Sequence, residues 1–292
     1  MYVATLLSNP TEPVLGIENV LPYHRQLKGG EFRWLKDRVA CEFPIPAIEP
    51  GHRKIWNSLQ DRGIDLVIQK AKGRRKKILL ADMDSTMIGQ ECIDELADEA
   101  GFGPQVAEIT AQAMNGLIEF DGALRKRVAL LKGLSETVID DVLEKRITPT
   151  AGAKLLLATM RGNDGYSALV SGGFTDFTQA VAAGLGFDEN RANTLGIEDG
   201  KLTGEVVGPI LGRQAKIDAL NEICAARGLL PEDVIAVGDG ANDLGMLKLA
   251  GTGVALHAKP AVQKQAEVVI NHGDLTALLY IQGYAWTDFV KL

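Results

Sequence analysis

The chain has 292 residues, 46% of them apolar, which is enough to bury one large core or two smaller ones. A formal net charge of −7 and a pI near 5.3 leave no broad basic surface for a phosphate backbone, so nucleic acid is not expected as a partner. No apolar stretch approaches the roughly 18 residues of a membrane span, so a membrane is not expected either.

The first part of the chain, residues 1–72, mixes strand and helix patterns. Strands are expected in YVATLL, FRWLKDRVACEF and IDLVIQKA, and a helix in PGHRKIWNSLQDRG. This predicts a small α+β accessory domain that resembles an ACT-like module, which would bind an amino acid and support a homodimer. A structural appendage that only promotes assembly is an equal alternative. The basic run AKGRRKK that follows is interpreted as a linker into the next strand.

From residue 76 to residue 292, short apolar runs alternate with helical segments, which predicts the fold class α/β. The expected strands are KKILLADMD, YSALVSGG, DVIAVGDG, TGVAL and AEVVI. Continuous apolar strands between helices are typical of a parallel sheet covered on both faces. Ligands of such sheets bind beyond the carboxyl ends of the strands, where Asp82, Ser171 and Asp239 stand.

Two segments interrupt this alternation. Residues 89–147 contain four amphipathic helical stretches, in ECIDELADEA, PQVAEITAQAMNG, FDGALRKRVALLKG and SETVIDDVLEKR. They predict a helical cap inserted after the first strand, which would exclude water from the site when it closes. The later segment NTLGIEDGKLTGEVVG has Asp199-Gly200 between alternating runs and predicts an inserted hairpin.

Polar residues at the predicted strand ends suggest a phosphate site with a metal. An isolated pair such as Asp82 and Asp84 is weak evidence, because it is also typical of a helix cap. Two glycines after Ser171 let backbone N–H groups approach a ligand, and Lys216 stands at a predicted helix start. The segment VGDGAND adds Asp239, Asn242 and Asp243. Oxygen ligands beside a phosphate suit Mg²⁺.

The roles of the first two aspartates follow from their positions. Asp82, at the strand tip, is the candidate nucleophile that attacks phosphorus to form an aspartyl-phosphate. Asp84, on the following turn, can protonate the leaving alkoxide and later take a proton from water. A carboxylate and a phosphate charge repel by about 4 kcal/mol at 4 Å and an effective dielectric of 20, which Mg²⁺ and Lys216 would offset.

The order DMDST, SGG, lysine and GDGAND resembles the haloacid dehalogenase (HAD) superfamily of phosphotransferases, over residues 76–292. The closer resemblance is to members that act on phosphorylated serine. It implies a Rossmann-like core with a helical cap and Mg²⁺-dependent hydrolysis of O-phospho-L-serine, the last step of L-serine biosynthesis. Hydrolysis of another small phosphate ester, or phosphate transfer to an alcohol, is the alternative.

The resemblance also implies the ligand sets. For Mg²⁺ these are the Asp82 carboxylate, the Asp84 backbone carbonyl and Asp239, with Asp243 in support. For the phosphate end of the substrate they are Ser171, the Gly172 backbone, Lys216 and Asn242.

At the other end of the substrate, the resemblance implies that Glu91 receives the ammonium group and that Arg127 clamps the carboxylate, a task that suits a bidentate guanidinium. Met114 and Phe120 would be apolar cap residues over the serine moiety. Each of these residues also has a simpler interpretation. Glu91 is typical of a helix N-terminus, Arg127 of a solvated helix face, and Met114 and Phe120 of a core.

The remaining reactive residue types are given no part in the chemistry. Cys41, Cys92 and Cys224 lack paired spacing, and the start MYVATLLSNPTEP does not resemble a signal peptide, so a cytoplasmic location is expected. Cys92 is interpreted as a small buried apolar residue. The histidines fit no triad or zinc spacing: His24, His52, His257 and His272.

Overall fold

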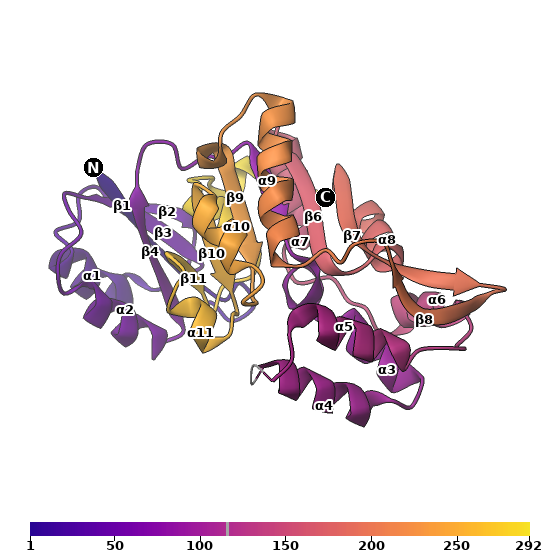
Figure 1. Cartoon of the computed structure of the whole chain (residues 1–292). Coiled ribbons are helices and arrows are strands. Elements are labelled where there is room, and N and C mark those ends of the chain that lie inside the picture. Colours follow the sequence, from indigo (N-terminus) through magenta and orange to yellow (C-terminus); the bar gives the residue numbers. More distant parts are fainter. Residues whose placement is uncertain (115–116) are drawn as a thin grey trace.

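The computed structural model describes residues 1–114 and 117–292, except for the side chains of Ala113 and Met114. Figure 1 shows a small sheet with two helices beside a larger sheet, and a group of helices beyond one end of the larger sheet. Among the described residues, none of the helices has the length and apolar character needed to cross a membrane.

The small sheet is antiparallel with strand order β2-β3-β1-β4. Its elements are β1 (Tyr2–Ser8), α1 (Ile17–Gln26), β2 (Arg33–Lys36), β3 (Ala40–Ile45), α2 (His52–Gln60) and β4 (Ile64–Lys70). This βαββαβ order is that of a ferredoxin-like domain. The expected strands and α2 are present. Helix α1 was not expected, because Pro22 lies inside it and no side chain caps its start.

The two faces of the small sheet are buried differently. One face packs against α1 and α2, with Leu6 and Phe43 in that core. The other face contributes Leu7, Leu35 and Val67 to the main core of the larger domain. Because the small sheet shares a core with the rest of the chain, its position is held by apolar packing as well as by polar contacts.

The larger sheet has the order β11-β10-β9-β5-β6-β7-β8, and every neighbouring pair except β7 and β8 is parallel. Its strands are β5 (Ile78–Ala81), β6 (Tyr166–Phe174), β7 (Glu189–Glu198), β8 (Lys201–Val207), β9 (Val234–Gly238), β10 (Thr252–Leu256) and β11 (Val268–Ile270). Central β5 is buried on both faces, with Leu79 in one core and Leu80 in the other. The α/β fold class is confirmed.

Helices cover both faces of the larger sheet, as Figure 1 shows. They are α7 (Ala153–Arg161), α8 (Thr175–Leu185), α9 (Arg213–Arg227), α10 (Leu244–Leu249), α11 (Pro260–Gln263) and α12 (Ala277–Ile281). β5 lies between β6 and β9, so their three carboxyl ends meet at one edge. This topology brings Asp82, Ser171 and Asp239 to the same place.

The four expected cap helices are all present between β5 and α7. They are α3 (Cys92–Glu99), α4 (Gly103–Met114), α5 (Phe120–Ala129) and α6 (Thr137–Lys145). Figure 1 shows this group beyond the carboxyl ends of the strands. Apolar residues of α3, α5 and α6, such as Leu96, Leu124 and Val142, join the main core.

The expected hairpin is formed by β7 and β8, but it is not an inserted element. β7 begins as the parallel neighbour of β6 and then runs on into the hairpin, so the sheet itself extends outward. Both turn residues, Asp199 and Gly200, have positive φ, as a two-residue type I′ turn requires. The hairpin supports the cap, because Gly133 N–H donates to Leu202 O at 2.8 Å and Leu202 N–H donates to Leu134 O at 2.9 Å.

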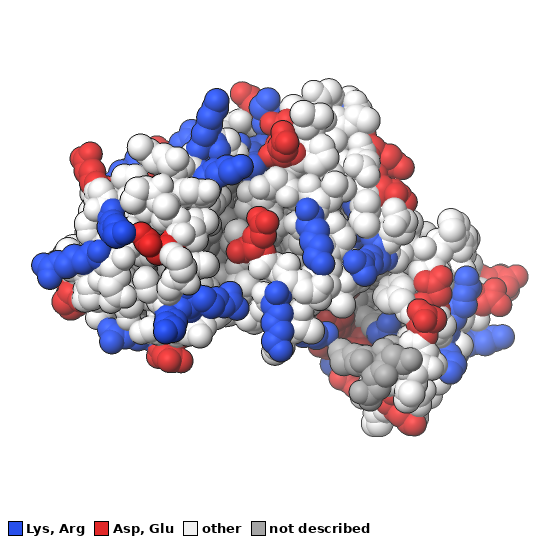
Figure 2. Space-filling model, turned by 60° about the vertical axis from the view of Figure 1, so that its left-hand side comes forward, with Lys and Arg blue, Asp and Glu red and all other residues white. Residues whose placement is uncertain are grey.

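Polar contacts tie the small sheet to the larger one. Asp65 of β4 is fully buried, and its carboxylate accepts hydrogen bonds from three backbone N–H groups after β11, each at 2.9 Å: Asn271, His272 and Gly273. The basic segment 71–77 joins β4 to β5, and its Arg74 pairs with the buried Glu42 of β3. On the face in Figure 2, lysines and arginines are dispersed with acidic side chains between them.

Candidate active site

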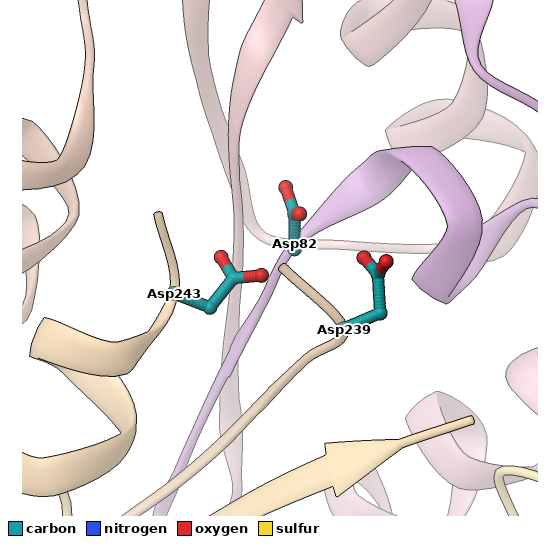
Figure 3. A group of neighbouring side chains, drawn as sticks. All are labelled: Asp82, Asp239 and Asp243. Atoms are coloured by element: carbon teal, nitrogen blue, oxygen red, sulfur yellow. The ribbon is translucent and has the colours of Figure 1, made fainter. Parts of the chain in front are cut away.

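Three carboxylates converge at the carboxyl edge of the larger sheet. Asp82 follows β5, Asp239 follows β9, and Asp243 precedes α10. Figure 3 shows all three side chains pointing to the same side of the strand ends, and an oxygen from each lies within 4.8 Å of the others. All three residues are buried. These carboxylates form the acidic centre of the site.

The turn after β5 sets the direction of the Asp82 side chain. Residues Met83–Met87 form a tight turn with non-helical backbone at Asp84 and at Ser85, whose φ is 54°. Ile88 N–H closes the turn by donating to Met83 O at 3.1 Å. Met83 N–H donates to Asp82 Oδ1 at 2.8 Å. The sequence indicated a small polar turn here, but its left-handed residue is not glycine, so no sequence signal predicted this conformation.

Lys216 is the cation of the acidic centre. It lies in the first turn of α9, as expected, and its Nζ is 2.6 Å from Asp82 Oδ1 and 2.6 Å from Asp243 Oδ1. Burial lowers the pKa of Lys216, but the carboxylates of Asp243 and Asp82 more than compensate, so the pKa is raised. The pKa of Asp82 is raised by burial and then by Asp243, against the effect of Lys216. One ammonium therefore faces several buried carboxylates.

The acidic centre has the donor set and the charge for Mg²⁺, which prefers oxygen ligands and few carboxylates. Both oxygens of Asp243 already accept hydrogen bonds, from Lys216 Nζ at 2.6 Å and from Gly240 N–H at 2.9 Å. Asp82 and Asp239 are therefore the direct ligand candidates, and Asp243 supports them by holding Lys216. Burial, and then Asp243, raise the pKa of Asp239 to about 6.

Binding of Mg²⁺ is expected to weaken as pH falls through about 6, because the metal needs the ionised Asp239 carboxylate and must displace its proton. The rise in unfolding temperature on adding Mg²⁺ should be smaller at pH about 5.5 than at pH about 7.5. In the variant Asp239→Asn, Mg²⁺ should have little effect at either pH. An equal effect of Mg²⁺ on the unmodified protein at both pH values would contradict this assignment.

Asp84 is held in place by the first turn of the cap. Its Oδ1 accepts a hydrogen bond from Cys92 N–H at 3.0 Å, at the start of α3. Burial, and then the carboxylate of Glu91, raise the pKa of Asp84 to about 6. A carboxyl group with this pKa can both donate and accept a proton near neutral pH. Cys92 itself is fully buried with a raised pKa, so its interpretation as a small apolar residue is confirmed.

The end of β6 provides a close backbone approach beside Asp84. Ser171 is buried, and its Oγ accepts a hydrogen bond from Gly173 N–H at 2.8 Å. A Cβ on Gly173 would lie 2.8 Å from Asp84 Oδ2, which is too close for any larger residue without a shift. Ser171, Gly172 and Gly173 all line the cavity described below, so this segment can approach a ligand closely.

A cavity of about 600 Å³ connects the acidic centre with the cap, within the usual range for a small-molecule site. Its lining includes these predicted residues: Asp82, Asp84, Glu91, Phe120, Arg127, Ser171, Gly172, Asp239 and Asn242. Lys216 lies directly beneath, in contact with Asp82. The side chain of Met114 lies outside the described residues.

The structure distinguishes between the alternatives for three cap residues. Glu91 makes no capping hydrogen bond to α3, and its Oε1 instead accepts from Ser85 Oγ at 2.6 Å. Arg127 is mostly buried and lines the cavity, whereas its neighbours Arg125 and Lys126 are exposed. Phe120 is 36% exposed at the cavity and is not part of a core. Glu91 is nevertheless the N-cap residue of α3, so its simpler interpretation agrees with its position. The simpler interpretations of Arg127 as a solvated residue and of Phe120 as a core residue are wrong.

Sequence reasoning missed Asp94 and Thr110, which line the cavity beside the predicted Arg127. Asp94 Oδ1, Thr110 Oγ1 and Arg127 Nε are buried without a hydrogen-bond partner in the described part of the chain. Buried polar atoms usually have a partner, so these atoms favour a polar ligand. Asp94 lies three residues after Glu91 on one helix face, which could have been predicted. Lys259 also lines the cavity, but no local signal indicated it.

Comparison with known proteins agrees with this site. Residues 79–248 match the family model of haloacid dehalogenase-like hydrolases. A phosphoserine phosphatase of Streptomyces coelicolor is 41% identical over 258 residues, covering 86% of this chain and 62% of that protein. A phosphoserine phosphatase of Methanocaldococcus jannaschii is 43% identical over 206 residues, covering 70% of this chain and 97% of that protein.

Solved structures are similar as well. A HAD family hydrolase of Salmonella enterica serovar Typhi has a TM-score of 0.87 at 29% identity, covering 97% of this chain and 99% of that one. A substrate-bound phosphoserine phosphatase has a TM-score of 0.66 at 42% identity, covering 70% of this chain and 98% of that one. The chain therefore belongs to the haloacid dehalogenase-like hydrolase family, and its relatives from Streptomyces coelicolor and Methanocaldococcus jannaschii are phosphoserine phosphatases.

Proposed function

We propose that the chain is a Mg²⁺-dependent phosphoserine phosphatase, which hydrolyses O-phospho-L-serine to L-serine and phosphate. The observation that carries this proposal is the single cavity that joins Asp82 to Glu91 and Arg127. One end has the residues for phosphoryl transfer, and the other has a carboxylate and a guanidinium for a zwitterion. The similar proteins from Streptomyces coelicolor and Methanocaldococcus jannaschii support it.

In the first step, Asp82 attacks phosphorus and the serine oxygen leaves. Oδ1 of Asp82 is held by Met83 N–H and Lys216 Nζ. No hydrogen bond within the described chain reaches Oδ2, so Oδ2 is the oxygen that forms the bond to phosphorus. Asp84 gives its proton to the leaving oxygen, which the raised pKa of about 6 makes available.

In the second step, water attacks the aspartyl-phosphate, and Asp84, now ionised, takes the proton from that water. Asp82 is regenerated and phosphate is released. The same carboxyl group serves as acid and then as base because its pKa of about 6 lies close to neutral pH. The hydrogen bond from Cys92 N–H keeps Asp84 in one orientation through both steps.

In this proposal the phosphate oxygens are held by Ser171, the Gly172 peptide, Asn242 and Lys216. The first three line the cavity, and Lys216 lies beneath it in contact with Asp82. Such fixed donors stabilise charge that spreads over the phosphoryl oxygens as it transfers. Mg²⁺ would be held by Asp82, the Asp84 carbonyl and Asp239, and when bound it offsets the repulsion between the phosphate and the carboxylates.

The first test is phosphate release from a panel of small phosphate esters, with Mg²⁺ and with EDTA. A strong, Mg²⁺-dependent preference for O-phospho-L-serine is expected. Similar activity on all esters would agree with the phosphatase mechanism but would contradict the assignment of O-phospho-L-serine as the substrate. Appearance of a phosphorylated alcohol when an alcohol is added would instead identify a phosphotransferase.

Removing either amino-acid contact is expected to affect one substrate selectively. Glu91→Ala and Arg127→Ala should each lower kcat/KM for O-phospho-L-serine by about 10- to 100-fold, the scale of a hydrogen bond to a charged group. Turnover of p-nitrophenyl phosphate should fall by less than about threefold, because this ester has neither an ammonium nor a carboxylate group and its weakly basic leaving group needs little protonation by Asp84. Arg125→Ala, on the exposed side of α5, is the matched control. Equal losses on both esters would refute the assignment.

For residues 1–72 we propose an ACT-like accessory domain that supports a homodimer, in a cytoplasmic enzyme. The ferredoxin-like strand order and the core shared with the larger domain support this proposal. Light scattering of the full chain tests the dimer, and a monomer would refute it. Non-competitive inhibition by L-serine would add a sensor role, whereas purely competitive inhibition leaves the domain with a role in assembly.

A further inference from the structure

Asn193 of β7 connects two segments of the phosphate end of the site. It is 2% exposed, and its side-chain amide makes three hydrogen bonds. Nδ2 donates to Gly172 O at 2.8 Å and to Leu211 O at 3.4 Å, and Oδ1 accepts from Leu211 N–H at 2.7 Å. Both ends of the amide are therefore used, which a carboxylate or an aliphatic side chain cannot reproduce.

The two segments joined by Asn193 both bind phosphate in the proposed reaction. Gly172 belongs to the Ser171–Gly173 segment at the end of β6. Leu211 directly precedes Gly212, the N-cap of α9, whose first turn contains Lys216. These segments lie on different elements. The backbone N–H and C=O of Leu211 both form hydrogen bonds with the Asn193 side chain.

The same two segments also pack against the start of cap helix α5. A Cβ on Gly172 would lie 3.2 Å from Cζ of Phe120, and a Cβ on Gly212 would lie 3.4 Å from its Cδ1. The ring of Phe120 thus lies against two glycines whose spacing depends on Asn193. A change in that spacing would alter both the phosphate contacts and the packing of Phe120 at the start of α5.

We propose that Asn193 is a positioning residue that holds the Ser171–Gly173 segment and the start of α9 at the spacing required to bind the transferring phosphoryl group. It acts through Gly172 and Leu211 and does not itself touch the substrate. The proposal deepens the phosphatase assignment but does not depend on the amino-acid end of the substrate. Its effect must therefore be the same for every phosphate ester that the enzyme accepts.

The decisive variant is Asn193→Asp, which keeps the shape of the side chain, removes both donors and places a carboxylate against two carbonyl oxygens. We expect kcat to fall by about 30-fold or more for both O-phospho-L-serine and p-nitrophenyl phosphate, with the ratio between the esters unchanged. Inhibition by inorganic phosphate should weaken by about tenfold. Asn190→Asp on the same strand is the control, because within the described residues the Asn190 side chain only accepts a hydrogen bond, from Thr178 Oγ1.

A purely structural role would lower the unfolding temperature but leave phosphate inhibition of the folded enzyme unchanged, and this result would overturn the proposal. A loss confined to O-phospho-L-serine would overturn it as well. If Asn193→Asp does not fold, the smaller Asn193→Ser is measured in the same way. A wrong substrate assignment can be told apart from a wrong role for Asn193. It would appear as a different preferred ester in the unmodified enzyme, and Asn193→Asp would still lower kcat for every ester.

Discussion

Asp82→Asn is expected to lower kcat by at least about 10⁴-fold, the scale of the loss of an enzymatic nucleophile. An amide of the same shape cannot attack phosphorus, and no other side chain in the cavity holds the same position relative to Lys216 and Ser171. The measurement is phosphate release with saturating Mg²⁺. The exposed Asp98→Asn, on cap helix α3, removes a carboxylate away from the centre and should retain full activity.

The stability of this variant distinguishes a chemical loss from a folding defect. Burial and Asp243 raise the pKa of Asp82, so its ionised form is disfavoured in the metal-free protein. Replacing it by a neutral amide removes this unfavourable charge. In EDTA, Asp82→Asn should therefore unfold at a temperature no lower than that of the unmodified protein. Residual kcat within about tenfold of the unmodified enzyme would exclude Asp82 as the nucleophile.

Lys216→Met is expected to impair both activity and stability. Without the ammonium, Asp82 and Asp243 remain buried with no cation, and breaking a buried ion pair in this way costs about 3–5 kcal/mol of unfolding free energy. Loss of a cation that contacts the phosphoryl group should lower kcat by about 10²- to 10³-fold. Lys248→Met, at an exposed position on α10, is the matched control.

The destabilisation should depend on pH in a defined direction. In Lys216→Met the folded protein is expected to hold the carboxyl protons more tightly than the unfolded chain does. Stability must then fall as pH rises. Relative to the unmodified protein, Lys216→Met should lose more unfolding free energy at pH about 7.5 than at pH about 5, measured by urea unfolding in EDTA. A loss that is the same at both pH values would contradict the ion-pair account, and Mg²⁺ should restore part of the stability at the higher pH.

The sequence was informative wherever the chemistry is local. Strand β5 could be predicted because its apolar run is continuous, and Asp82 and Asp84 follow it at once in the chain. The four cap helices could be predicted because each has apolar residues on one face. Helix α1 was missed because Pro22 weakens its helical pattern. The hairpin was interpreted as an insertion because the pairing of β7 with β6 cannot be recognised from the sequence of β7 alone.

The side-chain directions that complete the site depend on tertiary structure. Arg125 and Arg127 stand in one run of cations, yet only Arg127 lines the cavity, since the packed face of α5 determines its direction. Glu91 is the N-cap residue of α3, and only the folded turn directs its carboxylate toward Ser85 and not toward the N–H groups of the helix. In such cases the same residue type is common both at an exposed helix position and in a binding site, and the residues packed around it in the folded protein determine which of the two it occupies.

The amino-acid sequence by itself determined the α/β class, the order of the motifs and the residue types of a phosphate and Mg²⁺ site, because hydrophobic period and chemical identity are properties of neighbouring residues. Only the tertiary structure decided that Lys216 lies between Asp82 and Asp243, that Asn193 joins Gly172 to Leu211, and that Asp65 binds the segment after β11. These contacts join residues far apart in the chain, and their geometry depends on the packing of whole elements.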